Sequence, residues 1–76
     1  MNNERRKTLN DIQQELEALK ERLQEVQQEE QSAVDNLPEG ILASERGQKM
    51  EASADALDTA VGNLDEAIDM INEACA

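Results

Sequence analysis

The sequence predicts an all-α fold, an antiparallel two-helix coiled-coil hairpin that pairs with a second copy into a four-helix bundle. Apolar residues recur with alternating spacings of three and four in two long segments, which is the pattern of a coiled-coil seam. A short segment with proline and glycine separates them. At 76 residues the chain is too short for one small core to offset comfortably the entropy of ordering its backbone. We therefore expect residues 1–76 to form a single domain that relies on self-association or a partner.

The first helix is predicted at about residues 3–36. Its apolar residues occupy the a and d positions of a heptad repeat, with Leu9, Leu16, Leu23 and Leu37 at a, and Ile12, Leu19, Val26 and Ala33 at d. Glu30 takes the remaining a position, and we interpret it as a side chain that extends past a loosely packed layer. Nearly every other position is polar, so this stripe fits one neighbouring helix.

A turn is predicted at about residues 37–44. Pro38 disfavours a helical conformation at Leu37, Gly40 permits a left-handed turn, and Ser44 is a good N-cap for the helix that follows. The second helix is predicted at about residues 45–75. Its seam has Ala54, Val61, Ile68 and Cys75 at a, and Met50, Leu57, Leu64 and Ile71 at d.

The short connection implies that the two helices run antiparallel. In an antiparallel coiled coil an a layer faces a d layer, so the numbers of facing residues sum to a constant, which is 80 here. This register pairs Leu23 with Leu57 and Leu19 with Val61. It also predicts that the aliphatic d residues of the first helix lie inside the seam.

The second helix has an apolar stripe wider than a two-stranded seam uses. One interpretation is that alanine, the best helix former, simply fills neutral positions. The other is that small residues let another helix approach closely, and we expect this one, with the second helix of another copy as the neighbour. The predicted self-association edge of the homodimer consists of Ala56, Ala60, Ala67, Met70 and Ala74.

The other flank of the second helix carries an acidic stripe, and no basic residue follows Lys49. Such a stripe is either a solvated face that keeps the protein soluble, or a row of carboxylates, about 4.5–6 Å apart along the axis, that imitates nucleic-acid phosphates toward a basic groove. The net charge of −11 repels nucleic acid and attracts basic protein surfaces, so we expect a basic protein partner and no direct nucleic-acid binding. The candidate partner-binding residues are Asp55, Asp58, Asp65, Glu66, Asp69 and Glu73.

The composition argues against catalysis and against cofactors. The chain has no histidine and a single cysteine, Cys75, so it lacks the usual ligand set of a structural zinc site, and we expect no metal site. There is no plausible nucleophile with a base and no glycine-rich phosphate loop, so we expect no enzyme activity. Without a signal peptide or an apolar run of about 20 residues, we expect no membrane association and a cytoplasmic location.

The stretch "LPEGILASERGQKM", read with the heptad segments on both sides, resembles short acidic helical-hairpin proteins of bacteria, phages and other mobile elements. The resemblance covers nearly the whole chain, and it implies a phage-like origin and a location in the bacterial host cell. Small acidic proteins of such origin often bind and block host proteins, including nucleic-acid-handling defence enzymes. The favoured hypothesis is therefore a non-enzymatic acidic protein-binding module that inhibits a host protein by occupying its basic, nucleic-acid-binding surface. The alternative is a self-assembling helical adaptor or scaffold.

Overall fold

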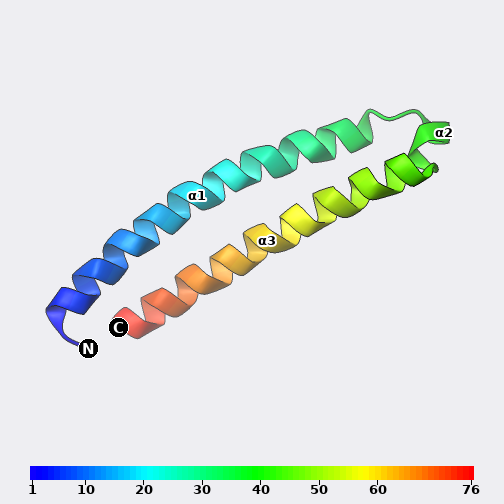
Figure 1. Ribbon diagram of the computed structural model, residues 1–76. Helices are drawn as coiled ribbons and strands as arrows, with labels where there is room; N and C mark the ends of the chain where they lie inside the picture. The colour runs from blue at the N-terminus through cyan, green and yellow to red at the C-terminus, as the bar shows by residue number, and fades with distance from the viewer.

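The computed structural model describes residues 1–76 as a hairpin of two long antiparallel helices (Figure 1). Helix α1 spans Asn3–Asp35, the short α2 spans Glu39–Leu42, and α3 spans Glu45–Cys75. The two chain ends lie together at one end of the hairpin, and α2 lies at the other. The sequence-based bounds of about 3–36 and 45–75 differ from the observed ones by at most one residue, and the predicted hairpin geometry is confirmed.

The hairpin is long and thin, with extents of 58 × 15 × 13 Å and a radius of gyration of 17.2 Å. A compact chain of this length has a radius of gyration of about 11 Å. The elongated shape follows from two helices that lie side by side with nothing packed on either face. Neither long helix contains an apolar stretch long enough to cross a membrane.

Both long helices begin at a residue whose side chain caps the first turn. The Asn2 side chain accepts a hydrogen bond from the Arg5 amide at 2.8 Å, and the Ser44 side chain accepts one from the Gly47 amide at 3.3 Å. These bonds satisfy amides that have no carbonyl partner within their own helix. The expectation that Ser44 caps the second long helix is therefore confirmed.

The turn is built by a helical segment and contains no left-handed residue. Gly40 lies inside α2, and no glycine in the chain has a positive φ, so the left-handed turn expected at Gly40 is wrong. The chain reverses instead because the amides of Ile41 and Leu42 both bond to the carbonyl of Pro38, at 3.0 and 2.9 Å. A single right-handed helical turn thus replaces the tight turn.

Gly47 is buried where α2 packs on the first turn of α3. A Cβ atom at this position would lie 2.5 Å from the Leu42 carbonyl oxygen and 2.7 Å from the Leu42 Cα. Real Cβ contacts are not that short, so only glycine lets the backbone of α2 come this close.

The core is small and is built mainly by α3. Only five residues are buried, and no large side chain is fully buried. The a row of α3 is buried as predicted except for half-buried Cys75, while its d row and the a-position leucines of α1 are half-buried. The buried residues are Val34, Gly47, Ala54, Val61 and Ile68.

The seam of α1 differs from the prediction. Ile12, Leu19 and Val26, predicted to lie inside the seam, are exposed by 39%, 50% and 51%. The half-buried row beside the leucines is instead a polar row, one residue further along the chain. Near the turn, Val34 is buried instead of Ala33. That polar row consists of Gln13, Lys20 and Gln27. Helix α1 is therefore rotated about its own axis relative to the predicted seam.

Two side-chain contacts join the helices, Gln13 to Asn72 and Lys20 to Asp65, and the residue numbers of each pair sum to 85. The predicted sum of 80 applies to facing a and d residues. In the same register the e residues that flank the seam pair at sums of 78 or 85, so these two contacts do not contradict the predicted register, which stays a prediction.

Candidate interaction surfaces

Polar bridges connect the two helices along one face of the hairpin. The Gln13 amide nitrogen donates to Asn72 Oδ1 at 2.7 Å, and Lys20 Nζ donates to Asp65 Oδ1 at 2.6 Å. All four residues occupy the e row of their heptads, and in antiparallel pairs e rows meet on one side of the seam. We call this side the polar face.

The Lys20 to Asp65 bridge is the only ion pair between the helices. The hydrogen bond to Asp65 raises the pKa of Lys20, the charge of Asp65 and the nearby carboxylates of Glu17 and Glu21 act in the same direction, and partial desolvation opposes them. The Lys20 side chain is 23% exposed and that of Asp65 is 53% exposed, so solvent screens the pair. The bridge orients the helices and adds little to their stability.

The acidic stripe lies on the polar-face side of α3. All six predicted residues are exposed, and they occupy neighbouring heptad rows on the side of Asp65, away from the leucines. Only Asp65 has a cationic partner, because the remaining ion pair of the protein joins Lys49 to Glu45 at 4.0 Å in the first turns of α3. The carboxylates without a cationic partner are Asp55, Asp58, Glu66, Asp69 and Glu73.

The predicted self-association edge lies on the opposite side of α3, beyond the row of Leu57, Leu64 and Ile71. Nothing in the hairpin covers this edge: Met70 is 59% exposed, and among the alanines only Ala60 is half-buried. The edge is uncharged along its whole length. The structure therefore leaves it free for a neighbour outside the chain.

The exposed row of α1 lies on the same side of the hairpin as this edge. Each of its residues precedes a residue of the polar row and is rotated by about 100° from it, to the far side of the leucines. We define the open apolar face by two outer rows and the leucines between them. The outer rows are Ile12, Leu19 and Val26 on α1 and Ala60, Ala67 and Ala74 on α3, all exposed except half-buried Ala60; between them lie half-buried Leu16, Leu23, Leu57 and Leu64. The hairpin thus has one polar and one apolar face.

Sequence reasoning missed the contribution of α1 to this face. The heptad pattern assigned Ile12, Leu19 and Val26 to the seam because they are the apolar residues with the correct spacing. A signal for the other arrangement was present: Gln13 and Lys20 are long polar residues in the row that can meet Asn72 and Asp65 on α3. The half-burial of Gln13 and Lys20 accompanies the rotation that exposes the aliphatic row.

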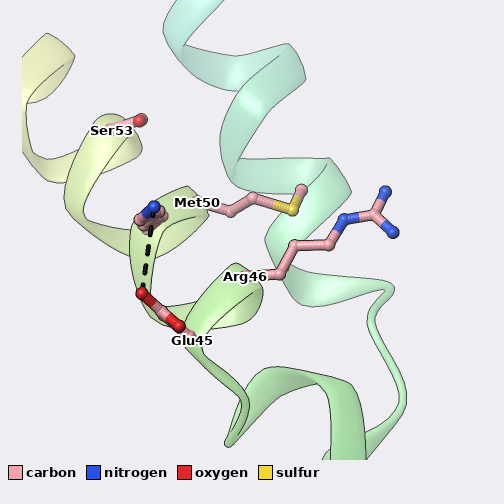
Figure 2. Close-up of a pocket in the computed structure, with 5 residues that line it drawn as sticks. Glu45, Arg46, Met50 and Ser53 are labelled. Carbon is pink, nitrogen blue, oxygen red and sulfur yellow. Dashed lines mark ion pairs between the residues drawn. The ribbon is translucent and has the colours of Figure 1, made fainter.

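Hollows on the surface are shallow and open. One at the start of α3 is lined by Glu45, Arg46, Lys49, Met50 and Ser53 (Figure 2). Arg46 and Met50 extend toward α1, while Glu45 turns toward Lys49, and only Met50 among the lining residues is apolar. A second hollow, on α1, includes Leu19 and Val26 and belongs to the open apolar face.

The structure offers binding surfaces. No group of three or more Asp, Glu, His or Cys side chains is placed to hold a metal ion, and Cys75 is a free, half-buried thiol. The raised pKa of Lys20 comes first from the structural bridge to Asp65. What the arrangement can do chemically is to present charge on one face and apolar surface on the other.

No protein-family model, curated protein or solved structure matches this chain.

Proposed function

We propose that the protein is a non-enzymatic binding module whose acidic stripe occupies a basic surface of another protein. The observation that carries this proposal is that the carboxylates of the acidic stripe are exposed and, apart from Asp65, have no cation to neutralise them. None of the contacts that hold the hairpin together requires the charges of the other five. A row of like charges along a helix also destabilises the folded state, because the charges repel each other. A role in binding a basic partner would explain why the row is present.

The geometry of the stripe supports a partner surface that normally binds nucleic acid. Carboxylates three or four residues apart on a helix are separated by about 4.5–6 Å along the axis, and nucleic-acid phosphates follow one another at a similar spacing. The straight helix α3 holds them in order without further conformational cost on binding. A partner whose lysine and arginine side chains are arranged to bind a phosphate backbone would therefore face carboxylates of complementary charge.

The resemblance to short proteins of phages and mobile elements supports the class of partner that we propose. In this proposal the protein acts in the cytoplasm of a bacterial host and blocks a nucleic-acid-handling host protein, such as a defence enzyme, as a mimic of DNA. The negative charge of −11 would also steer the encounter with such a basic surface.

Charge reversal on α3 tests the proposal. The variant Asp58→Lys/Asp69→Lys leaves Asp65 in place, because Asp65 binds Lys20 and its loss would alter the hairpin. The matched control Asp11→Lys/Glu25→Lys changes the net charge equally on the outer side of α1, where both residues are exposed. Each protein is used to capture binding proteins from a bacterial lysate at low and high salt, with duplex DNA as competitor.

We expect the unmodified protein and the α1 control to retain the same basic, nucleic-acid-binding proteins, and salt and duplex DNA to release them. The α3 variant should lose them, because two of the carboxylates that face the partner become cations. Equal capture by the α3 variant, or capture that neither salt nor DNA weakens, would remove the acidic stripe as the binding surface.

A self-assembling adaptor or scaffold is the second candidate, and the open apolar face favours it. Replacing Ala60 and Ala67 by bulky polar residues should dissociate such an assembly and leave a charge-driven interaction on the other side of α3 intact. If that variant also failed to capture the proteins from the lysate, a self-assembling scaffold would describe the function better than a charge-driven binding module.

A further inference from the structure

We propose that the open apolar face is covered by a second copy of this chain, which packs on it in antiparallel fashion to form a four-helix bundle. The two-fold axis of this dimer crosses the helices near Leu19 on α1 and Ala67 on α3. The proposal is independent of the acidic stripe, which lies on the opposite face of the hairpin.

The accessible surface of the chain exceeds that of a compact protein of the same mass. A compact protein of 8.4 kDa exposes about 4,600 Å² by the scaling of surface with mass. This chain exposes 5649 Å². The excess of about 1,000 Å² is comparable with the roughly 800 Å² that each partner buries in a standard protein interface. A second copy would thus cover the amount of surface by which the hairpin departs from a compact protein.

The exposed row of α1 has the spacing that another helix requires. Ile12, Leu19 and Val26 follow one another at seven-residue intervals and extend over about 21 Å of the helix. Leu19 and Val26 each leave about half of the side chain in water. Behind this row the leucines of both helices are only half-buried, so a helix laid on the face would complete their burial.

The face also has the symmetry of a dimer with itself. Leu19 is the middle residue of the exposed row of α1. The contact between Lys20 and Asp65 places the neighbouring Leu19 close to the level of Asp65 on α3. Ala67, the middle residue of the row Ala60, Ala67 and Ala74, is adjacent to that level. One two-fold axis therefore relates both rows to their copies, α1 on α1 and α3 on α3, each pair antiparallel.

Charges beside the exposed row favour a second copy over an unrelated helix. Glu15 and Arg22 flank the row of Leu19 on its outer side, and neither forms an ion pair within the hairpin. Antiparallel packing centred on Leu19 brings Glu15 of each copy to the partner's Arg22, so two opposite-charge pairs form. A parallel arrangement would place like charges opposite each other, so the charges of Glu15 and Arg22 favour the antiparallel arrangement.

The first test is the mass of the protein in solution, measured by light scattering or sedimentation with Cys75→Ser as background so that no disulfide contributes. At about 100 µM we expect twice the chain mass of 8.4 kDa. Leu19→Gln and Ala67→Gln should each raise the dissociation constant by about 100-fold, since every substitution acts twice in the dimer. Ala18→Gln and Ala52→Gln, on the outer sides of the same helices, should remain dimers.

A folded monomer at that concentration overturns the proposal, and so does a dimer that Leu19→Gln and Ala67→Gln leave unchanged. The second test uses charge and does not disturb the apolar face. Glu15→Arg and Arg22→Glu should each weaken the dimer by about 3–10-fold at low salt, and the double variant should restore it. A double variant that associates no better than the single ones overturns the antiparallel arrangement.

Discussion

The glycines of α3 allow a direct test of how the turn is built. Gly47 and Gly62 lie in the same helix, yet their surroundings differ. At Gly62 an added Cβ would meet nothing within 4 Å, whereas at Gly47 it would meet the backbone of α2. We therefore compare Gly47→Ala with Gly62→Ala, two identical chemical changes of which only one affects a contact between elements.

The expected magnitudes follow from these surroundings. Alanine is more favourable than glycine in a helix interior by about 1 kcal/mol, and Gly62→Ala should gain about that much stability. At Gly47 the Leu42 carbonyl oxygen and Cα lie only 2.5 and 2.7 Å from the added Cβ. Backbone atoms cannot move aside as a side-chain end can, so α2 must shift by about 1 Å, and overpacking of this kind costs about 1–3 kcal/mol. The gain in helix propensity is no larger at Gly47, so the difference between the two variants should be about 1–3 kcal/mol.

Thermal unfolding followed by circular dichroism measures this difference, with all proteins at one concentration because a dimer is stabilised by mass action. For a domain of this size each kcal/mol corresponds to about 4–8 °C in Tm. We expect Gly62→Ala to unfold at the highest temperature and Gly47→Ala to unfold at least about 4 °C below it. If Gly47→Ala were as stable as Gly62→Ala, α2 would not dock on α3 as described.

Three further outcomes are expected. Ser44→Ala should lower the free energy of unfolding by about 1 kcal/mol, because the Gly47 amide loses its cap; chemical denaturation measures it, and an unchanged midpoint would contradict the capping geometry. Ile68→Ala should cost about 2–5 kcal/mol, since Ile68 is only 6% exposed, and a cost below that of Ile12→Ala would contradict the assigned core of the hairpin. The raised pKa of Lys20 stabilises the hairpin below the unfolded pKa of lysine, about 10.4, and this contribution is lost as pH rises through the folded pKa. Tm should therefore fall more between pH 9 and 12 in the unmodified protein than in Lys20→Gln, and parallel profiles would show that the bridge to Asp65 is absent in solution.

The two proposals are compatible in space. In a dimer formed through the open apolar face, the polar face of each hairpin points outward, so an acidic stripe is displayed on both sides of the bundle. Because each copy carries a net charge of −11, the two copies repel each other, and salt should strengthen the dimer while it weakens binding to a basic partner. The opposite salt responses separate the two faces in one experiment.

Much of the hairpin follows from local features of the chain. Ser44 caps a helix, Pro38 prevents the first helix from continuing, and the apolar spacing in both helices defines their lengths. Ala54, Val61 and Ile68 of the a row of α3 are buried as the heptad pattern predicts, because they have no equally apolar row beside them on the acidic side. The acidic stripe is also recognisable without a structure, since it depends only on the periodicity of one helix.

The rotation of α1 and the docking of the turn on α3 depend on contacts that a heptad pattern does not contain. Such a pattern indicates which side chains leave water, but α1 has leucines with an aliphatic row on one side and a polar row on the other, and either row can complete the seam. In the structure the polar row does so, with Gln13 and Lys20 bridged to α3, and the backbone of α2 lies against Gly47. Rotating a helix by one row moves every residue of that row at once, so Ile12, Leu19 and Val26 turn outward together.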